Sequence, residues 1–194
     1  MPKSSNSDKA ILFLNNLAGD DLWEYGHEMM PEYNKTHIPH RLFKYKLGSK
    51  NAYKSDGVYV TSAPYDLKGF GNIQIYGFPF LSLAVDPFDI DYPDPVHGLV
   101  VTEDMQMFDY FMEQEPGLLN VANPQFSRLA WAKTQSLPTV LAVHHARGYV
   151  GDYDKLSKMM GMEIFCPVVW HEGELDANFL QKAVEAVFSE IKQV

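Results

Sequence analysis

Continuous apolar segments that alternate with amphipathic helical patterns are the feature that most restricts the fold of this chain. Apolar runs occupy residues 10–14, 97–101 and 139–143, and residues 176–191 repeat apolar side chains at helical spacing. A strand that is apolar along its whole length must be buried on both faces, as in a parallel sheet covered by helices. The order of these patterns predicts an α/β fold, a mostly parallel sheet with helices on both faces.

Further elements are expected between these segments. Turn residues separate two alternating runs, which predicts a hairpin of strands 57–62 and 72–76 that adds one antiparallel edge. Four more segments carry strand or helix signals: a strand at 162–169, helices at 124–136 and 152–160, and a helix start at 102–104. Residues 31–51 are polar and without periodicity, which predicts a long functional or mobile connection.

Residues 9–30 have the layout of a phosphate-binding loop: an apolar strand, a tight loop and a helix. Such a loop needs glycines that let backbone N–H groups approach phosphate, a Lys, and a Ser or Thr for Mg²⁺. After Leu14 only Gly19 is kept, and Asp20 and Asp21 stand where the Lys and the hydroxyl belong. The same residues also suit an ordinary helix start, in which an Asp carboxylate caps the N-terminus in place of phosphate.

Composition limits the class of protein. With 194 residues, 46% apolar and 13% aromatic, the chain can bury one substantial core, so one domain is expected at 9–194 after a flexible lead-in at 1–8. The net charge of −9 without a Lys/Arg cluster disfavours nucleic acid and anionic membranes and favours basic protein partners. A single Cys166 excludes a disulfide framework, and no membrane-spanning or signal segment is recognised. A cytoplasmic protein without membrane insertion is therefore expected.

Four further segments occupy motif positions after expected strands. These are IYGFPF at 75–80, GLVVTE at 98–103, AVHHAR at 142–147, and PVV at 167–169 before WHEG. Together with residues 9–30, this order resembles the small Ras-like GTPases of the P-loop fold, closest to the bacterial gliding and polarity (MglA-like) branch. In that family these positions hold the second phosphate-sensing turn, a central strand, the guanine-reading N-K-x-D motif and a base-capping loop.

The resemblance extends to the order of the elements and the positions of the motifs. Few of the residues that contact nucleotide in the family are kept. Gly77 remains in the phosphate-sensing turn, while His144, His145 and Arg147 stand in the guanine motif. Arg147 has only donors where an Asp would accept from the base, which leaves unsatisfied groups at about 1–3 kcal/mol each. The degenerate nucleotide positions are Leu14, Gly19, Asp20, Asp21, Gly77, His144, His145 and Arg147. No nucleotide, metal or other cofactor is expected.

The resemblance therefore implies a non-catalytic pseudo-GTPase: a protein-binding module or scaffold in a polarity, motility or related regulatory pathway. Its partner would be a protein, with a basic surface, an active small GTPase or its regulator. Two enzymatic alternatives remain: a nucleotide hydrolase with atypical contacts, or an unrelated α/β enzyme that uses His144 or His145 at the carboxyl end of a strand. A Cys166–His171 nucleophile pair is not expected, because Cys166 lies in an apolar run.

The expected docking surface comprises the two segments in switch positions, residues 31–51 and 78–95. Aromatic side chains would supply anchors and aspartates would attract a basic partner. The residues concerned are Phe78, Phe80, Asp86, Phe88, Asp89, Asp91, Tyr92 and Asp94. Because residues 31–51 are basic, the two segments could instead hold each other closed. The aspartates lack the glycine and the terminal Glu of a Ca²⁺-binding EF-hand loop, so no Ca²⁺ site is predicted.

Overall fold

The protein is described from a computed structural model, which covers residues 9–15, 51–55, 58–67, 71–78, 86–104, 128–144, 148, 150–172 and 177–191. The described strands are β1 (Ala10–Asn15), β2 (Asn51–Ser55), β3 (Val58–Leu67), β4 (Gly71–Phe78), β5 (Val96–Asp104), β6 (Thr139–His144) and β7 (Val168–His171). The described helices are α4 (Arg128–Thr134), α5 (Tyr153–Met160), α6 (Ala177–Ile191) and the short 3-10 helix η2 (Pro87–Asp89).

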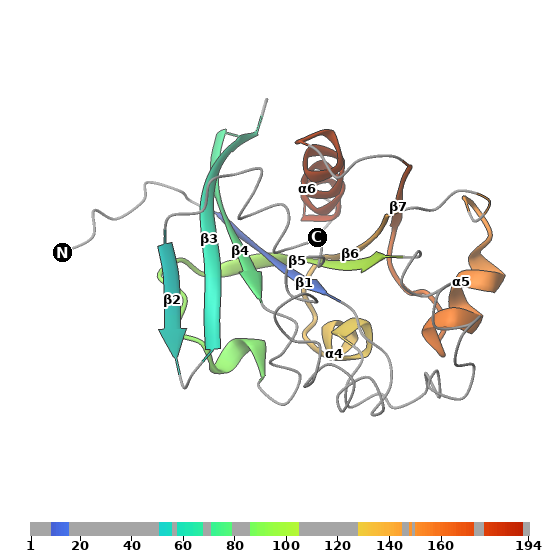
Figure 1. Ribbon diagram of the computed structural model, residues 1–194, viewed down its shortest axis with the longest axis horizontal. Helices are drawn as coiled ribbons and strands as arrows, with labels where there is room; N and C mark the ends of the chain where they lie inside the picture. The colour runs from blue at the N-terminus through green and yellow to red at the C-terminus, as the bar shows by residue number, and fades with distance from the viewer. Residues whose placement is uncertain are drawn as a thin grey trace, which may run out of the picture.

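The strands form one sheet in the order β2-β3-β4-β1-β5-β6-β7 (Figure 1). Five of them, β4-β1-β5-β6-β7, run parallel, whereas β2 pairs with β3 and β3 pairs with β4 in antiparallel register. The predicted α/β class and mostly parallel sheet are confirmed, and the arrangement is consistent with a P-loop NTPase-like fold. The predicted hairpin is confirmed as β3 and β4.

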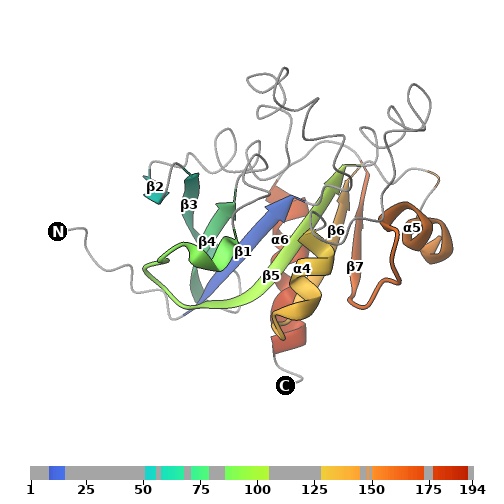
Figure 2. The ribbon, with the colours of Figure 1, turned by 90° about the horizontal axis from the view of Figure 1, so that it is seen from below.

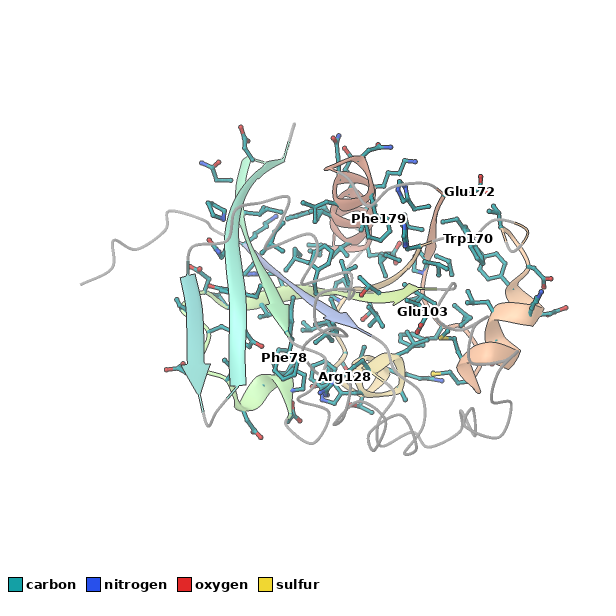
Figure 3. The ribbon with its side chains drawn as sticks, viewed as in Figure 1. Phe78, Glu103, Arg128, Trp170, Glu172 and Phe179 are labelled. Carbon is teal, nitrogen blue, oxygen red and sulfur yellow. The ribbon has the colours of Figure 1, made fainter. Side chains whose placement is uncertain are left out.

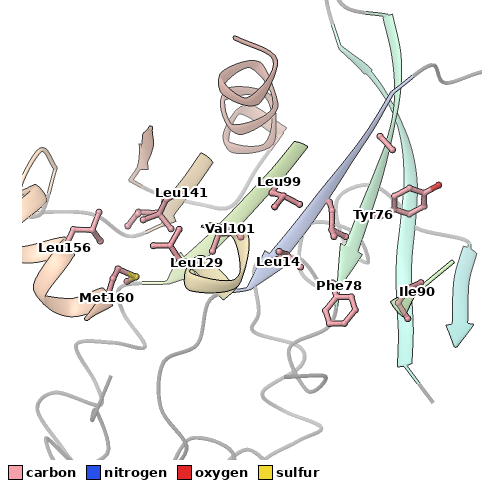
Figure 4. Packing of buried hydrophobic residues seen from close by; sticks show 14 residues of the cluster. Leu14, Tyr76, Phe78, Ile90, Leu99, Val101, Leu129, Leu141, Leu156 and Met160 are labelled. Atoms are coloured by element: carbon pink, nitrogen blue, oxygen red, sulfur yellow. The ribbon is translucent and has the colours of Figure 1, made fainter. Parts of the chain in front are cut away.

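Helices cover both faces of this sheet, and alternate side chains of each strand serve the two layers. In β1, Leu12 and Leu14 point into the cluster shared with α4 and α5, while Ile11 and Phe13 point into the cluster shared with α6. Figure 2 shows α4 and α6 on opposite sides of the sheet, and Figure 4 shows the cluster beneath α4. Complete burial of a strand on both faces explains its uninterrupted apolar sequence.

The predicted helix start at 102–104 is wrong, because those residues continue strand β5. Thr102, Glu103 and Asp104 pair with Ala142, Val143 and His144 of β6. Thr-Glu-Asp is a favourable helix start by local preference, but the backbone hydrogen bonds offered by the neighbouring parallel strand favour the extended conformation. The helix expected to follow this start lies outside the described residues.

The predicted strand at 162–169 is also wrong in extent, because only Val168 and Val169 of that range belong to β7. Residues 162–167 are irregular, and the strand instead extends to His171. Pro167 contributes to the late start, since it has no backbone N–H to donate to a ladder. Conversely, β3 extends beyond the predicted range 57–62 to Leu67 and includes Pro64, which pairs with Gln74 of β4. Pro64 lies beyond the end of β2, where a strand tolerates proline.

The remaining helix predictions agree with the structure where it describes them. Helix α5 begins after Asp152, whose carboxylate accepts from the Lys155 N–H at 2.9 Å, and ends before Gly161, whose φ is +63°. This is the expected pairing of a polar N-cap with a C-terminal glycine. Helix α6 closely matches the predicted range 176–191. For α4, the predicted start at 124–127 lies outside the described residues.

Strand β2 was not predicted. It begins at Asn51, the last residue of the connection expected at 31–51; the rest of that connection lies outside the described residues. Within the described part of the chain, no helix is long and apolar enough to cross a membrane.

Candidate functional site at the carboxyl ends of the strands

Strand β1 lies between β4 and β5 at the point where the strand order reverses. Open α/β sheets bind ligands outside the carboxyl ends of the strands at such a point. Pairing places Gly77 beside Phe13 and Phe78 beside Leu14 at this edge. The sheet thus brings together two of the predicted nucleotide positions, Leu14 and Gly77, and the third described one, His144, ends β6. Gly19, Asp20, Asp21, His145 and Arg147 lie outside the described residues.

The end of β1 is held tightly in the interior. Leu14 is fully buried, and its carbonyl oxygen accepts a hydrogen bond from Thr102 Oγ1 at 3.1 Å. Gly77 is buried in β4. These contacts fix the end of β1, the strand that precedes Gly19, Asp20 and Asp21 in the sequence.

His144 is enclosed by protein. It is 0% exposed, and its ring stacks on that of His171 with centroids 5.9 Å apart and planes 22° apart. Phe179 of α6 lies beside both rings, 6.3 Å from His144 and 5.0 Å from His171. Figure 3 labels Phe179 among the side chains between α6 and the sheet. The His144 ring therefore belongs to the packed layer under α6, where a substrate in solvent does not reach it.

The described side chains form neither a metal-binding group nor a reactive thiol. No group of three His, Cys, Asp or Glu residues in the described part of the chain could hold a metal ion. Burial raises the pKa of the Cys166 thiol to about 12, so the thiol stays protonated at neutral pH. A protonated thiol is a poor nucleophile, and this agrees with the expectation of an inert Cys166.

A second region of interest is the acidic strap, defined here as residues 86–95, which contains η2. Asp86 caps η2, since its Oδ1 accepts from the Phe88 N–H at 2.9 Å. Phe88 is 39% exposed and its ring packs on Trp131 of α4 with centroids 5.2 Å apart. Phe78, expected as an exposed anchor, is only 1% exposed and belongs to the core; Phe80 lies outside the described residues.

The far end of the strap is tied to β4. The Tyr76 hydroxyl donates to Asp94 Oδ2 at 2.7 Å, and the rings of Tyr76 and Tyr92 lie 5.0 Å apart. Burial raises the pKa of the Tyr92 hydroxyl well above its ordinary value. The four aspartates therefore differ: Asp86 and Asp94 accept hydrogen bonds within the protein, and only Asp94 is partly buried, whereas Asp86, Asp89 and Asp91 are exposed.

Arg128 is a buried cation that the sequence interpretation did not single out. It is 5% exposed, its guanidinium lies over the Phe78 ring at 5.0 Å, and Figure 3 labels both residues. Burial lowers the pKa of Arg128 to about 10, against the opposing influence of the Asp86 carboxylate. The available signal was its place beside Leu129 on the apolar side of an expected helix, where a charge needs a specific partner.

Comparison of the chain with models of known protein families and with curated proteins finds no match.

Proposed function

We propose that this chain is a nucleotide-independent protein-binding module on a small-GTPase-like frame: a pseudo-GTPase. Support comes from the α/β fold with its central β1, and from the sequence resemblance that puts Gly19, Asp20 and Asp21 in the phosphate-loop positions. The family's members act as polarity and motility switches, so the resemblance suggests a regulatory role of that kind in the cytoplasm.

The burial of His144 is the observation that carries the proposal. In the resemblance this residue occupies the first position of the guanine-reading motif, at the carboxyl end of β6. Its ring packs against His171 and Phe179 under α6, with no exposed surface to offer a base. The same burial counts against the alternative of an enzyme that uses His144 as a general base, because a base must reach the proton that it removes.

Electrostatics at the phosphate-loop position point in the same direction. A carboxylate about 4 Å from a phosphate charge is repelled by roughly 4 kcal/mol at an effective dielectric constant near 20. The attraction of the missing Lys is lost in addition. Since about 1.4 kcal/mol changes affinity tenfold, Asp20 and Asp21 would abolish ordinary GTP binding.

Titration of the purified chain with fluorescent GTP, GDP and ATP, each with Mg²⁺, tests the proposal. We expect no saturable binding, and no change in melting temperature at millimolar nucleotide, because only a ligand that binds the native state stabilises it. A rise of several degrees with GTP would reject the pseudo-GTPase and favour the atypical hydrolase.

The outward face of the acidic strap is the surface that we assign to a protein partner. Phe88 offers an exposed aromatic ring supported from below by Trp131, and Asp89 and Asp91 place exposed carboxylates near it in sequence. An aromatic anchor with acidic neighbours suits a basic partner, and such association weakens as salt rises.

A further inference from the structure

The acidic strap (residues 86–95) is joined to the rest of the molecule mainly by side chains. Its backbone hydrogen bonds between described residues are internal: the Asp89 N–H donates to the Asp86 carbonyl, and the Tyr92 N–H to the Ile90 carbonyl. Outward attachments include the Tyr76–Asp94 hydrogen bond, the ring contacts of Tyr92 and Phe88, and the electrostatic attraction between the Asp86 carboxylate and Arg128 of α4. A segment held in this way can separate without breaking the sheet's hydrogen-bond ladder.

Apolar burial favours the docked position. Pro87 is buried and Ile90 is 6% exposed within the cluster that also contains Tyr76 and Leu129. Figure 4 labels Ile90 and Tyr76 in this cluster. These two side chains must leave the core if the strap moves away, so the docked state is the ground state.

Two buried polar atoms, one on the strap and one on the α4 residue that packs against Phe88, oppose docking. Tyr92 Oη on the strap and Trp131 Nε1 on α4 are both shielded from solvent, and neither has a hydrogen-bond partner among the described residues. A buried group that leaves its hydrogen bond unmade loses the interaction that water would give it. Undocking restores this interaction to both atoms, which offsets part of the apolar penalty.

We infer that the strap undocks and gives up its internal hydrogen bonds while the sheet and α4 remain folded. Opening breaks the Tyr76–Asp94 bond, hydrates Tyr92 Oη and Trp131 Nε1, and uncovers the Tyr76 and Trp131 rings. The device is a hinged cover over an aromatic face of the molecule. The opening requires no nucleotide, and its test is independent of the test of the proposed function.

Amide hydrogen exchange of the full chain under native conditions tests the inference. We expect the amides of Phe88, Asp89 and Tyr92 to exchange through a local opening, at least about a hundredfold faster than those of the central strands after correction for intrinsic rates. Equal protection of the strap and of β5 and β6 would overturn it, because the strap would then open only when the whole protein unfolds.

Three variants identify the contacts responsible. Tyr76→Phe keeps the ring but removes the donor to Asp94, so strap protection should fall about ten- to a hundredfold while β6 is unchanged. Trp131→Phe keeps a ring under Phe88 but removes the unpaired N–H, so strap protection should rise severalfold. Tyr153→Phe, on the exposed side of α5, is the control and should change neither. Proportional loss of protection throughout the chain in Tyr76→Phe would overturn the inference, as would lower strap protection in Trp131→Phe.

Discussion

Gly98 shows how one residue sets the distance between a strand and a helix. A Cβ atom at this position of β5 would lie 2.4 Å from Val187 Cγ1 of α6 and 3.3 Å from the Pro138 carbonyl oxygen. We predict that Gly98→Ala lowers the free energy of unfolding by about 1–3 kcal/mol, the usual effect of overpacking. Urea denaturation measures the change.

The closeness of Gly98 and Val187 also predicts that their substitutions are coupled. Val187→Ala removes the methyl group that the new Cβ would strike, so Gly98→Ala should destabilise the Val187→Ala background less than the wild type. Additive effects in the double-mutant cycle would show that the strain arises elsewhere.

Cys166 gives a pH dependence whose sign follows from its pKa. Burial raises the pKa of the folded thiol to about 12, whereas an unfolded Cys titrates near pH ~8.5. Between these values the native state holds the proton that the unfolded state has lost, so stability falls as pH rises. From pH 7 to pH 10, wild type should lose about 1–2 kcal/mol more than Cys166→Ala in urea denaturation. Equal losses would mean that the thiol titrates alike in both states.

Contacts between residues far apart in the sequence were the part of the site that could not be predicted from the sequence. His144 was singled out as a strand-end residue, but its contacts with His171 and Phe179 join β6, β7 and α6. Their formation depends on strand order and on the angle of α6. Likewise, nothing local distinguishes Asp94, which bonds Tyr76, from Asp91, which is exposed.

Among the elements, prediction succeeded where one pattern dominated. The apolar run in β6 and the helical repeat in α6 are each compatible with only one way of burying their apolar side chains. Both elements lie within one residue of the expected bounds. It failed where the environment overrode local preference: Thr102–Asp104 joined a strand because β6 offers a ladder. The edge strand β2, with sequence NAYKS, carries no apolar alternation that would reveal it.

Within the acidic strap, we predict that the four aspartates separate into two classes. Asp94→Ala should lower the melting temperature, because it removes the acceptor of the buried Tyr76 hydroxyl at a typical 1–3 kcal/mol. The double variant Asp89→Lys/Asp91→Lys should leave it nearly unchanged, since exposed substitutions stay within about 0.5 kcal/mol. Differential scanning fluorimetry compares them.

A matched variant separates local effects from net charge. Asp154→Lys/Glu163→Lys reverses two exposed carboxylates away from the strap and changes the total charge equally. It should also leave the melting temperature nearly unchanged. Marked destabilisation by Asp89→Lys/Asp91→Lys alone would make these aspartates structural and remove the motive for a docking role.

For the molecule as a whole, the central strands tie the two layers together. Because side chains alternate along each strand, β1, β5 and β6 contribute to the cluster under α4 and α5 and also to the cluster under α6. Neither layer can lose its strands without exposing the other. This interdependence is the physical reason to expect a single cooperative domain, which remains a prediction for residues 9–194.

Leu180→Ala tests that cooperativity. Leu180 is 1% exposed in the α6 layer, and its truncation should reduce stability by about 2–5 kcal/mol. Trp131 and Trp170 pack against the opposite layer, so their fluorescence reports the side of the sheet that the substitution does not touch. In a single cooperative unit, the urea midpoints from fluorescence and from far-ultraviolet circular dichroism fall together by the same amount. If the fluorescence midpoint stayed at its wild-type value while the circular dichroism midpoint fell, the two layers would unfold separately and the single-domain prediction would be wrong.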